Sequence, residues 1–173
     1  MAQIKRNKKF TQTKLSYLPK EIYNFFFLVF TLLFALSIIS HDPSDPNFFK
    51  TGLGNTINNY IGIFGSYISH ITFMILGKTS YFLTALLIYL ALQKYRILIT
   101  NEKSLSFKNI SLIVILLFSL SMISEYIQAG SGGYLGHISF YHLSNYIGTY
   151  GSLLASVMCL IYSFTYYFDI SVS

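Results

Sequence analysis

Long apolar stretches separated by short polar segments constrain this chain more than any other feature. The first covers residues 22–40, and as a helix rising 1.5 Å per residue it would be roughly 28 Å long, about the thickness of a bilayer core. Charged residues make up only 10% of the chain, whereas soluble domains usually carry about 25%. Charged side chains this scarce could not cover the surface of a water-soluble globule of this size. The sequence therefore predicts an integral membrane protein.

We expect an all-α membrane protein with four transmembrane helices. Apolar residues dominate residues 60–92, which at roughly 50 Å would be too long for one crossing. The natural break is the polar run Gly77-Lys78-Thr79-Ser80, so an amphipathic helix over about 60–76 should lead into the second span. The expected spans are about 22–40, 79–92, 110–123 and 146–168.

The basic residues predict the orientation of these spans. Residues 1–21 form a basic N-terminal segment, and further basic residues lie in the segment 93–109. With the N- and C-termini in the cytoplasm, ten of the twelve Lys and Arg residues lie inside and only Lys50 and Lys78 lie outside, as the positive-inside rule requires. The membrane domain then covers 22–170. A nucleic-acid-binding arm is the weaker interpretation of the basic N-terminus.

Three groups of residues are candidates for a structural or functional role. The outer turn after the first span, suited to leaving the membrane abruptly, consists of Asp42, Pro43, Ser44, Asp45 and Pro46. Small residues that would let helices approach closely are Gly62, Gly65, Ser66, Gly77, Gly148 and Gly151. An outer glycine turn that would fold back on the membrane contains Gly132, Gly133 and Gly136.

An eight-residue motif occurs twice. Residues 59–66 and 145–152 agree at six of eight positions, at an offset of 86. Both copies would enter the membrane from the outside, so the repeat would be parallel. True duplication and chance similarity in a biased composition both remain open.

The sequence offers no set of residues for catalysis, and we expect no enzyme activity, cofactor or metal site in this chain. The run beginning at Gly77 looks like the end of a P-loop, but Thr72 stands where that motif needs a glycine. The four histidines lack the spacing of metal ligands. Glu125 ends the third span and could pair with Lys78 at the outer surface, which would be a structural contact.

In their order along the chain, these motifs resemble the N-terminal four-helix membrane domain of the FtsK/SpoIIIE DNA translocases. The similarity covers roughly residues 15–170, and its most specific parts are 41–48, 62–77 and 130–136. One departure is Ser69-His70, where the family tends to have Ala-Asp.

The resemblance implies a multi-pass domain of the bacterial inner membrane that anchors a hexameric, ATP-driven DNA pump at the division septum and contacts other division proteins. The family's linker and P-loop motor are absent from this chain, so we expect no direct contact with nucleic acid. We expect a domain, a truncated product or the product of a split gene.

An alternative is a small four-span transporter or channel subunit built on the repeat. That function would need polar residues along an intramembrane path. The expected spans offer only Asn24, hydroxyl groups and glycines.

Overall fold

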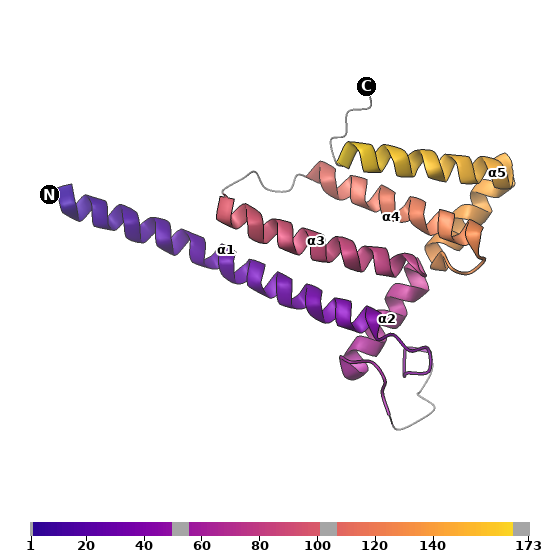
Figure 1. Cartoon of the computed structure of the whole chain (residues 1–173), viewed down its shortest axis with the longest axis horizontal. Coiled ribbons are helices and arrows are strands. Elements are labelled where there is room, and N and C mark those ends of the chain that lie inside the picture. Colours follow the sequence, from indigo (N-terminus) through magenta and orange to yellow (C-terminus); the bar gives the residue numbers. More distant parts are fainter. Residues whose placement is uncertain (1, 50–55, 101–106, 168–173) are drawn as a thin grey trace.

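The computed structural model describes residues 2–49, 56–100 and 107–167, and within them it has five helices and no strand (Figure 1). The helices are α1 (Ala2–Ile39), α2 (Gly62–Leu76), α3 (Thr79–Thr100), α4 (Phe107–Ile127) and α5 (Gly133–Tyr167). The all-helical fold expected from the sequence is therefore confirmed over the described residues.

Two of these helices are long and apolar enough to cross a membrane. They contain the segments Glu21–Ile39, with a mean hydropathy of 2.4, and Gly133–Tyr167, with a mean hydropathy of 1.5. The pair α2 and α3 passes the same test when taken together, although the two helices are bent by 113° at the break between them. The apolar part of α4, Ser111–Ile127, is shorter. The described helices thus identify a membrane domain with two candidate spans, or three with the bent pair.

The bend between α2 and α3 lies at Gly77. This residue ends α2 with a φ of 58°, a conformation that favours glycine. Its N–H donates to the carbonyl of Phe73 at 2.7 Å, which closes the last turn of α2. The structure therefore has its short helix at Gly62–Leu76, where the sequence analysis expects a helix over about 60–76.

Helix α5 differs from the expectation that the last span begins near residue 146. It begins at Gly133, and Gly148 interrupts it with a φ of 74° and a ψ of 168°. The helix consequently has a short first part, residues 133–147, and a longer second part, residues 149–167. Helix α1 also extends beyond the expected span, because it continues through the basic segment back to Ala2.

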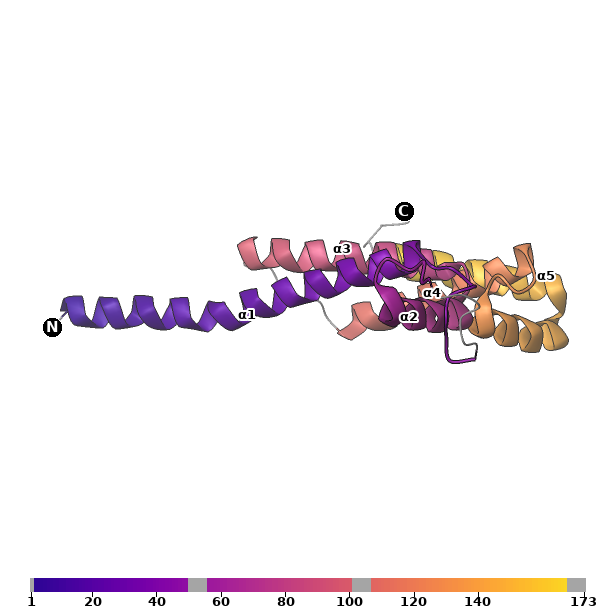
Figure 2. The same ribbon diagram turned by 90° about the horizontal axis from the view of Figure 1, so that it is seen from below.

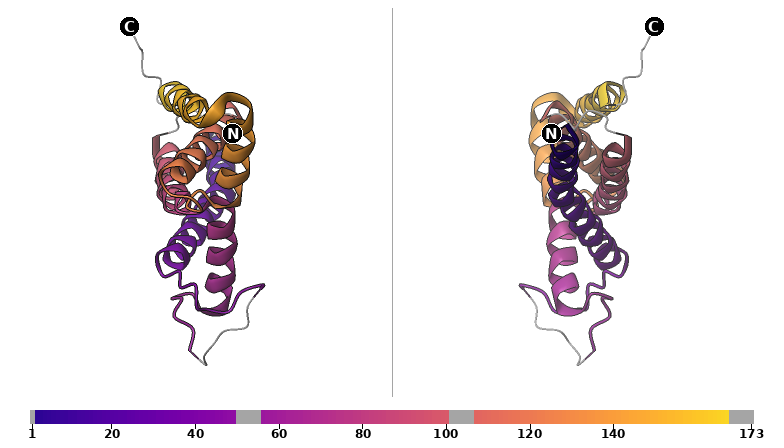
Figure 3. Two further views of the ribbon diagram at one scale, coloured as in Figure 1. Left: turned by 90° about the vertical axis from the view of Figure 1, so that its right-hand side faces the viewer. Right: turned by 90° about the vertical axis from the view of Figure 1, so that its left-hand side faces the viewer.

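The four long segments lie side by side in one row, in the order α1, α3, α4 and the second part of α5 (Figure 1). Seen from below, the row is thin (Figure 2). Helix α2 and the first part of α5 cross the ends of the long helices and follow one another in a single column (Figure 3). The short helices thus run transverse to the long helices and along the row.

Small residues form much of the interior of the row. Large apolar side chains such as Phe25, Phe26 and Leu154 are instead exposed. This distribution is typical of membrane helices, which associate through small residues and present bulky apolar side chains to lipid. The buried small and hydroxyl-bearing residues of the long helices include Thr31, Ala35, Ser37, Thr84, Ala91, Ser119, Ser121, Ser152, Ser156 and Ser163.

Candidate functional site

The outer turn is folded around its two aspartates. Pro43 and Ser44 occupy the middle of a turn closed by the Asp45 N–H donating to the Asp42 carbonyl at 3.2 Å. The Asp45 side chain is buried, with 2% of its surface exposed. Its two carboxylate oxygens accept the backbone N–H groups of Asn58 and Asn59 at 2.8 and 2.9 Å. Asp45 therefore fixes the segment that leads into α2.

Asp42 ties the same loop together from its exposed side. Its carboxylate accepts the backbone N–H and the hydroxyl of Ser44 at 2.8 and 2.7 Å, and the side-chain amide of Asn58 at 2.7 Å. These hydrogen bonds, from Ser44 first and then Asn58, lower the pKa of Asp42 to about 2. The carboxylate is thus ionised at neutral pH and engaged within its own loop.

Asn59 and Gly65 join α1 to α2. The buried Asn59 amide donates to the Ser37 carbonyl at 2.9 Å, and its oxygen accepts the Ile61 N–H at 3.1 Å. The Ser37 hydroxyl donates to the Gly65 carbonyl at 2.6 Å. A Cβ on Gly65 would lie 2.1 Å from the Asn59 side-chain oxygen, so this contact requires glycine. The neighbouring Ser66 hydroxyl donates to the Pro46 carbonyl.

His41 packs between α1 and α2 instead of standing free at the surface. Its ring stacks on Phe73 with centroids 4.3 Å apart, and its Nδ1 lies 3.0 Å from the Ser69 hydroxyl. Burial lowers the pKa of His41, and the nearby His70 lowers it further. The Ser69-His70 pair, where the chain departs from the family's usual residues, therefore faces His41.

The junction between the two halves of the chain is made by glycine backbone. The Lys78 N–H donates to the Ser131 carbonyl at 2.8 Å. A Cβ on Gly77 would lie 2.0 Å from that carbonyl oxygen, and a Cβ on Gly133 would lie 2.4 Å from the Gly77 nitrogen. Real Cβ atoms do not approach other atoms so closely, so both positions exclude side chains.

The glycine turn also crosses α4 at Ser121. A Cβ on Gly132 or Gly136 would lie 2.3 or 2.4 Å from the Ser121 carbonyl oxygen. Three glycines of the expected outer turn therefore form the contacts that hold α5 against α2 and α4.

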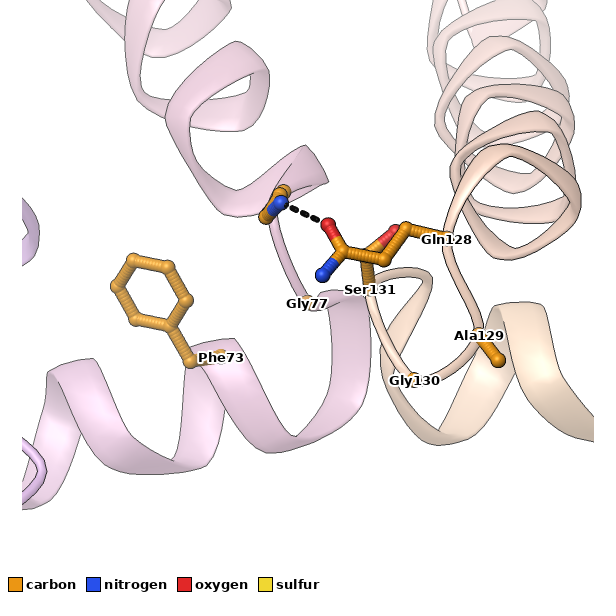
Figure 4. Close-up of a pocket in the computed structure, with 7 residues that line it drawn as sticks. Phe73, Gly77, Gln128, Ala129, Gly130 and Ser131 are labelled. Carbon is orange, nitrogen blue, oxygen red and sulfur yellow. Dashed lines mark hydrogen bonds between the residues drawn. The ribbon is translucent and has the colours of Figure 1, made fainter.

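Glu125 holds the loop that carries these glycines. Its carboxylate accepts the Gly130 N–H at 2.9 and 3.0 Å and the Gly132 N–H at 3.1 Å, and lies 2.9 Å from Nδ1 of His137. The expected pairing of Glu125 with Lys78 is wrong. The loop amides and His137 occupy the carboxylate, and the Lys78 ammonium donates to the Gln128 side-chain oxygen instead (Figure 4).

An open depression of about 340 Å³ lies beside this junction, lined by Phe73, Gly77, Lys78, Gln128, Ala129, Gly130 and Ser131 (Figure 4). The charged side chain in this lining, Lys78, is paired with Gln128. Within the described ranges, no three His, Cys, Asp or Glu side chains gather as metal ligands would. The depression is a seam between two elements of the fold.

For the remaining small residues, the structure differs from the close helix contacts that the sequence predicts. Among the described residues, no atom lies within 4 Å of a Cβ built on Gly62 or Gly148. Both have positive φ, 69° and 74°, so glycine there permits the backbone turn. The nearest atom to a Cβ on Gly151 would be that of Ile147 in the same helix, at 3.2 Å.

The repeated eight-residue motif does not occupy equivalent places in the fold. Gly62 of the first copy begins α2, whereas Gly148 of the second copy interrupts α5. A second relationship between the halves, not predicted from the sequence, has an offset of 71, at which Gly62, Gly65 and Gly77 correspond to Gly133, Gly136 and Gly148. Only the glycines reveal it, because few other residues agree.

These features define a helical integral-membrane domain whose interior is built from small residues. Residues 16–173 match the family model described as the 4TM region of DNA translocase FtsK/SpoIIIE, and the chain belongs to this family. The resemblance seen in the sequence is confirmed. Neither the curated proteins nor the solved structures give a match.

Membership in this family implies that the chain is a membrane-anchoring domain of an FtsK/SpoIIIE translocase. The matched region is a non-catalytic one, and the ATPase domain is not within these 173 residues. The link to cell division and DNA translocation is implied by the family alone.

Proposed function

We propose that this chain anchors its translocase in the bacterial inner membrane at the division septum and serves there as an oligomerisation platform, a hexameric one by analogy with the family. Its partners would be the bilayer, further copies of the chain and other division proteins, with no direct contact to nucleic acid. Family membership supports the anchor, and the row of long helices supports a platform.

The hydrogen bonds of the buried hydroxyl groups favour an anchoring function over a transport function. Several of them donate to carbonyls of their own helix three or four residues earlier, as Thr31 does to Phe27, Thr84 to Ser80 and Ser119 to Ile115, at 2.7–2.8 Å. Hydroxyls that donate within their own helix need no polar partner or solute to satisfy their O–H groups. The row therefore suits helix packing better than solute passage.

Helix lengths support four crossings, and the basic residues in 1–21 and 93–109 favour termini in the cytoplasm. The apolar part of α1, the helices α3 and α4, and the second part of α5 have about 19 to 22 residues each, or roughly 28–33 Å. Fusions of a fluorescent protein and of periplasmic alkaline phosphatase, placed after Thr100 and within residues 41–61, test this topology. Fluorescence at the first position and phosphatase activity at the second are the expected results.

Septal targeting is tested by following a C-terminally tagged chain in dividing bacteria. A mid-cell band that disappears when the division ring is depleted is the expected result. Uniform membrane fluorescence of an intact fusion that passes the topology test would refute targeting by this chain, while leaving membrane anchoring in place.

A further inference from the structure

The two halves of the chain share a structural plan. Each contains a 15-residue transverse helix, Gly62–Leu76 in α2 and residues 133–147 in α5. Each transverse helix begins at a glycine of positive φ, 69° at Gly62 and 64° at Gly133, and is followed by another, 58° at Gly77 and 74° at Gly148. A long helix follows each of these later glycines. The offset between the halves is 71 residues throughout.

Within one chain, the end of the first transverse helix meets the beginning of the second. Gly77 and Gly133 exclude side chains from this contact, and the Lys78 N–H reaches the Ser131 carbonyl across it. The two transverse helices therefore follow one another in a column with the same direction (Figure 3). Their dipoles align, because the carbonyl end of α2 faces the N–H end of α5.

The same plan leaves two ends of the column without such a contact. At Gly62 and Gly148, no described atom lies within 4 Å of a built Cβ. Large aromatic side chains stand exposed beside both ends: Tyr60 (75%) and Phe64 (70%) at one, Tyr146 (84%) and Tyr150 (81%) at the other. Exposed aromatic residues are enriched both in protein interfaces and in the interfacial belt of membrane proteins.

We propose that copies of this chain associate head to tail, with the Gly148 end of one copy seated against the Gly62 end of the next. The contact would reproduce between copies what Gly77 and Gly133 make within one. This proposal deepens the oligomerisation proposed above and rests on it. A second copy is the partner that fits, because the internal junction already joins the same two kinds of end, a glycine of positive φ after one transverse helix and another at the start of the next.

The proposal also accounts for the eight-residue motif that occurs twice. Its copies, residues 59–66 and 145–152, lie at the two ends that would meet. Because different surfaces of the two copies would be joined, the interface is heterologous. Such interfaces close into rings when the rotation between copies allows, and otherwise give open chains.

The offset of 71 predicts which residues should lie together at the proposed interface. Lys78 corresponds to Thr149, and Ser131 corresponds to Tyr60. Since Lys78 and Ser131 meet within the chain, Thr149 of one copy should lie beside Tyr60 of the next. Both of these residues are exposed within one copy.

Disulfide cross-linking in membranes tests this pairing. With the chain's single cysteine removed by Cys159→Ser, Tyr60→Cys and Thr149→Cys are placed in separate, differently tagged chains and co-expressed. Oxidation should yield a mixed dimer, whereas either variant expressed alone should yield little. Tyr134→Cys, at an exposed tyrosine near the other end of the transverse helix that precedes Thr149, replaces Thr149→Cys as the control and should give little product with Tyr60→Cys.

The mass of the Cys159→Ser chain in lipid nanodiscs separates the two proposals. A multiple of the chain mass without the specific cross-link would overturn the head-to-tail interface and leave oligomerisation standing. Equal cross-linking in the control, or strong self-cross-linking of one variant, would overturn the interface as well. A monomer mass without any cross-link would overturn both. The mixed dimer together with a multiple mass would support both.

Discussion

Gly77 and Gly133 approach so closely that neither could carry a side chain. A Cβ on Gly77 would lie 2.5 Å from the Gly133 nitrogen, and a Cβ on Gly133 would lie 2.4 Å from the Gly77 nitrogen. This contact joins the helices of the first half, α1 to α3, to those of the second, α4 and α5.

Replacing either glycine by alanine should therefore destabilise the domain strongly. With φ 58° and ψ −138°, Gly77 lies in a backbone region nearly restricted to glycine, which costs another residue about 1–3 kcal/mol, and forcing atoms apart in a packed contact costs about 1–3 kcal/mol more. We expect a loss of about 2–6 kcal/mol for Gly77→Ala, measured by reversible unfolding in detergent.

Gly130→Ala is the matched control for that experiment. Gly130 has a φ of 81°, but no described atom lies within 4 Å of its Cβ position. It should show the conformational cost alone, about 1–2 kcal/mol. Equal losses for Gly77→Ala and Gly130→Ala would contradict the importance of the close contact.

Glu125→Gln should loosen the glycine loop. The substitution keeps the size of the side chain but removes the charge that strengthens its hydrogen bonds to Gly130, Gly132 and His137. We expect a loss of about 1.5–3 kcal/mol and faster amide exchange at Gly130 and Gly132.

His137→Ala separates the contribution of the histidine contact from that of the loop amides. The His137 side chain is 65% exposed, so water can take its place beside the carboxylate, and we expect a loss of about 0.5–1.5 kcal/mol, the usual net contribution of one hydrogen bond. A loss as large as that of Glu125→Gln would show that the histidine, and not the loop amides, is the main partner of the carboxylate.

Asp45 and Asp42 should differ in their importance for the outer turn. Asp45→Ala would leave the Asn58 and Asn59 N–H groups without their acceptor in a buried site, at about 1–3 kcal/mol for each unsatisfied group. Proteolysis should then cut the segment before α2 more readily. Asp42→Ala, at an exposed carboxylate, should have the smaller effect, and the reverse order would contradict the arrangement of this loop.

Acid should weaken the contact between α1 and α2 through His41. The pKa of this histidine is lowered in the folded chain, so the unfolded chain binds the proton more readily. The stabilisation is therefore complete above about pH 6.5, the usual pKa of histidine, and is lost as the pH falls below it. Asp42, with a pKa of about 2, adds a separate loss only below its ordinary pKa near 3.9.

His41→Phe tests the origin of this dependence. A phenylalanine could keep the ring stacked on Phe73 without a titrating group. The variant should retain its stability as the pH falls below about 6.5, where the unsubstituted chain loses it. His70, Asp42 and Asp45 also act on His41, so a persistent pH dependence in the variant would assign it to one of them.

Some of the fold could be predicted from the sequence because it depends on local patterns. The polar run at Gly77 interrupts an apolar stretch too long for one crossing, and the structure bends there. The kink at Gly148 escaped prediction, because a glycine that allows a helix neighbour to approach and a glycine of positive φ look identical in a sequence.

The candidate site was harder to predict because its contacts are made by backbone. Lys78 and Glu125 have opposite charges at the expected outer surface, but nearby loop amides and His137 satisfy the carboxylate instead. The partners of Gly77 lie more than fifty residues away. Such pairings follow from the fold and are not visible in residue spacing.

The junction at Gly77 also has a consequence for the order in which the chain is made. Helices α1 to α3 are synthesised before residues 131–133, so the surface of Gly77 that these residues cover is open until the second half has been made. During that interval, the completed α4 and α5 of a neighbouring chain could occupy it. A membrane crowded with nascent copies could therefore yield exchanged dimers, in which α1 to α3 of each chain pack against α4 and α5 of the other.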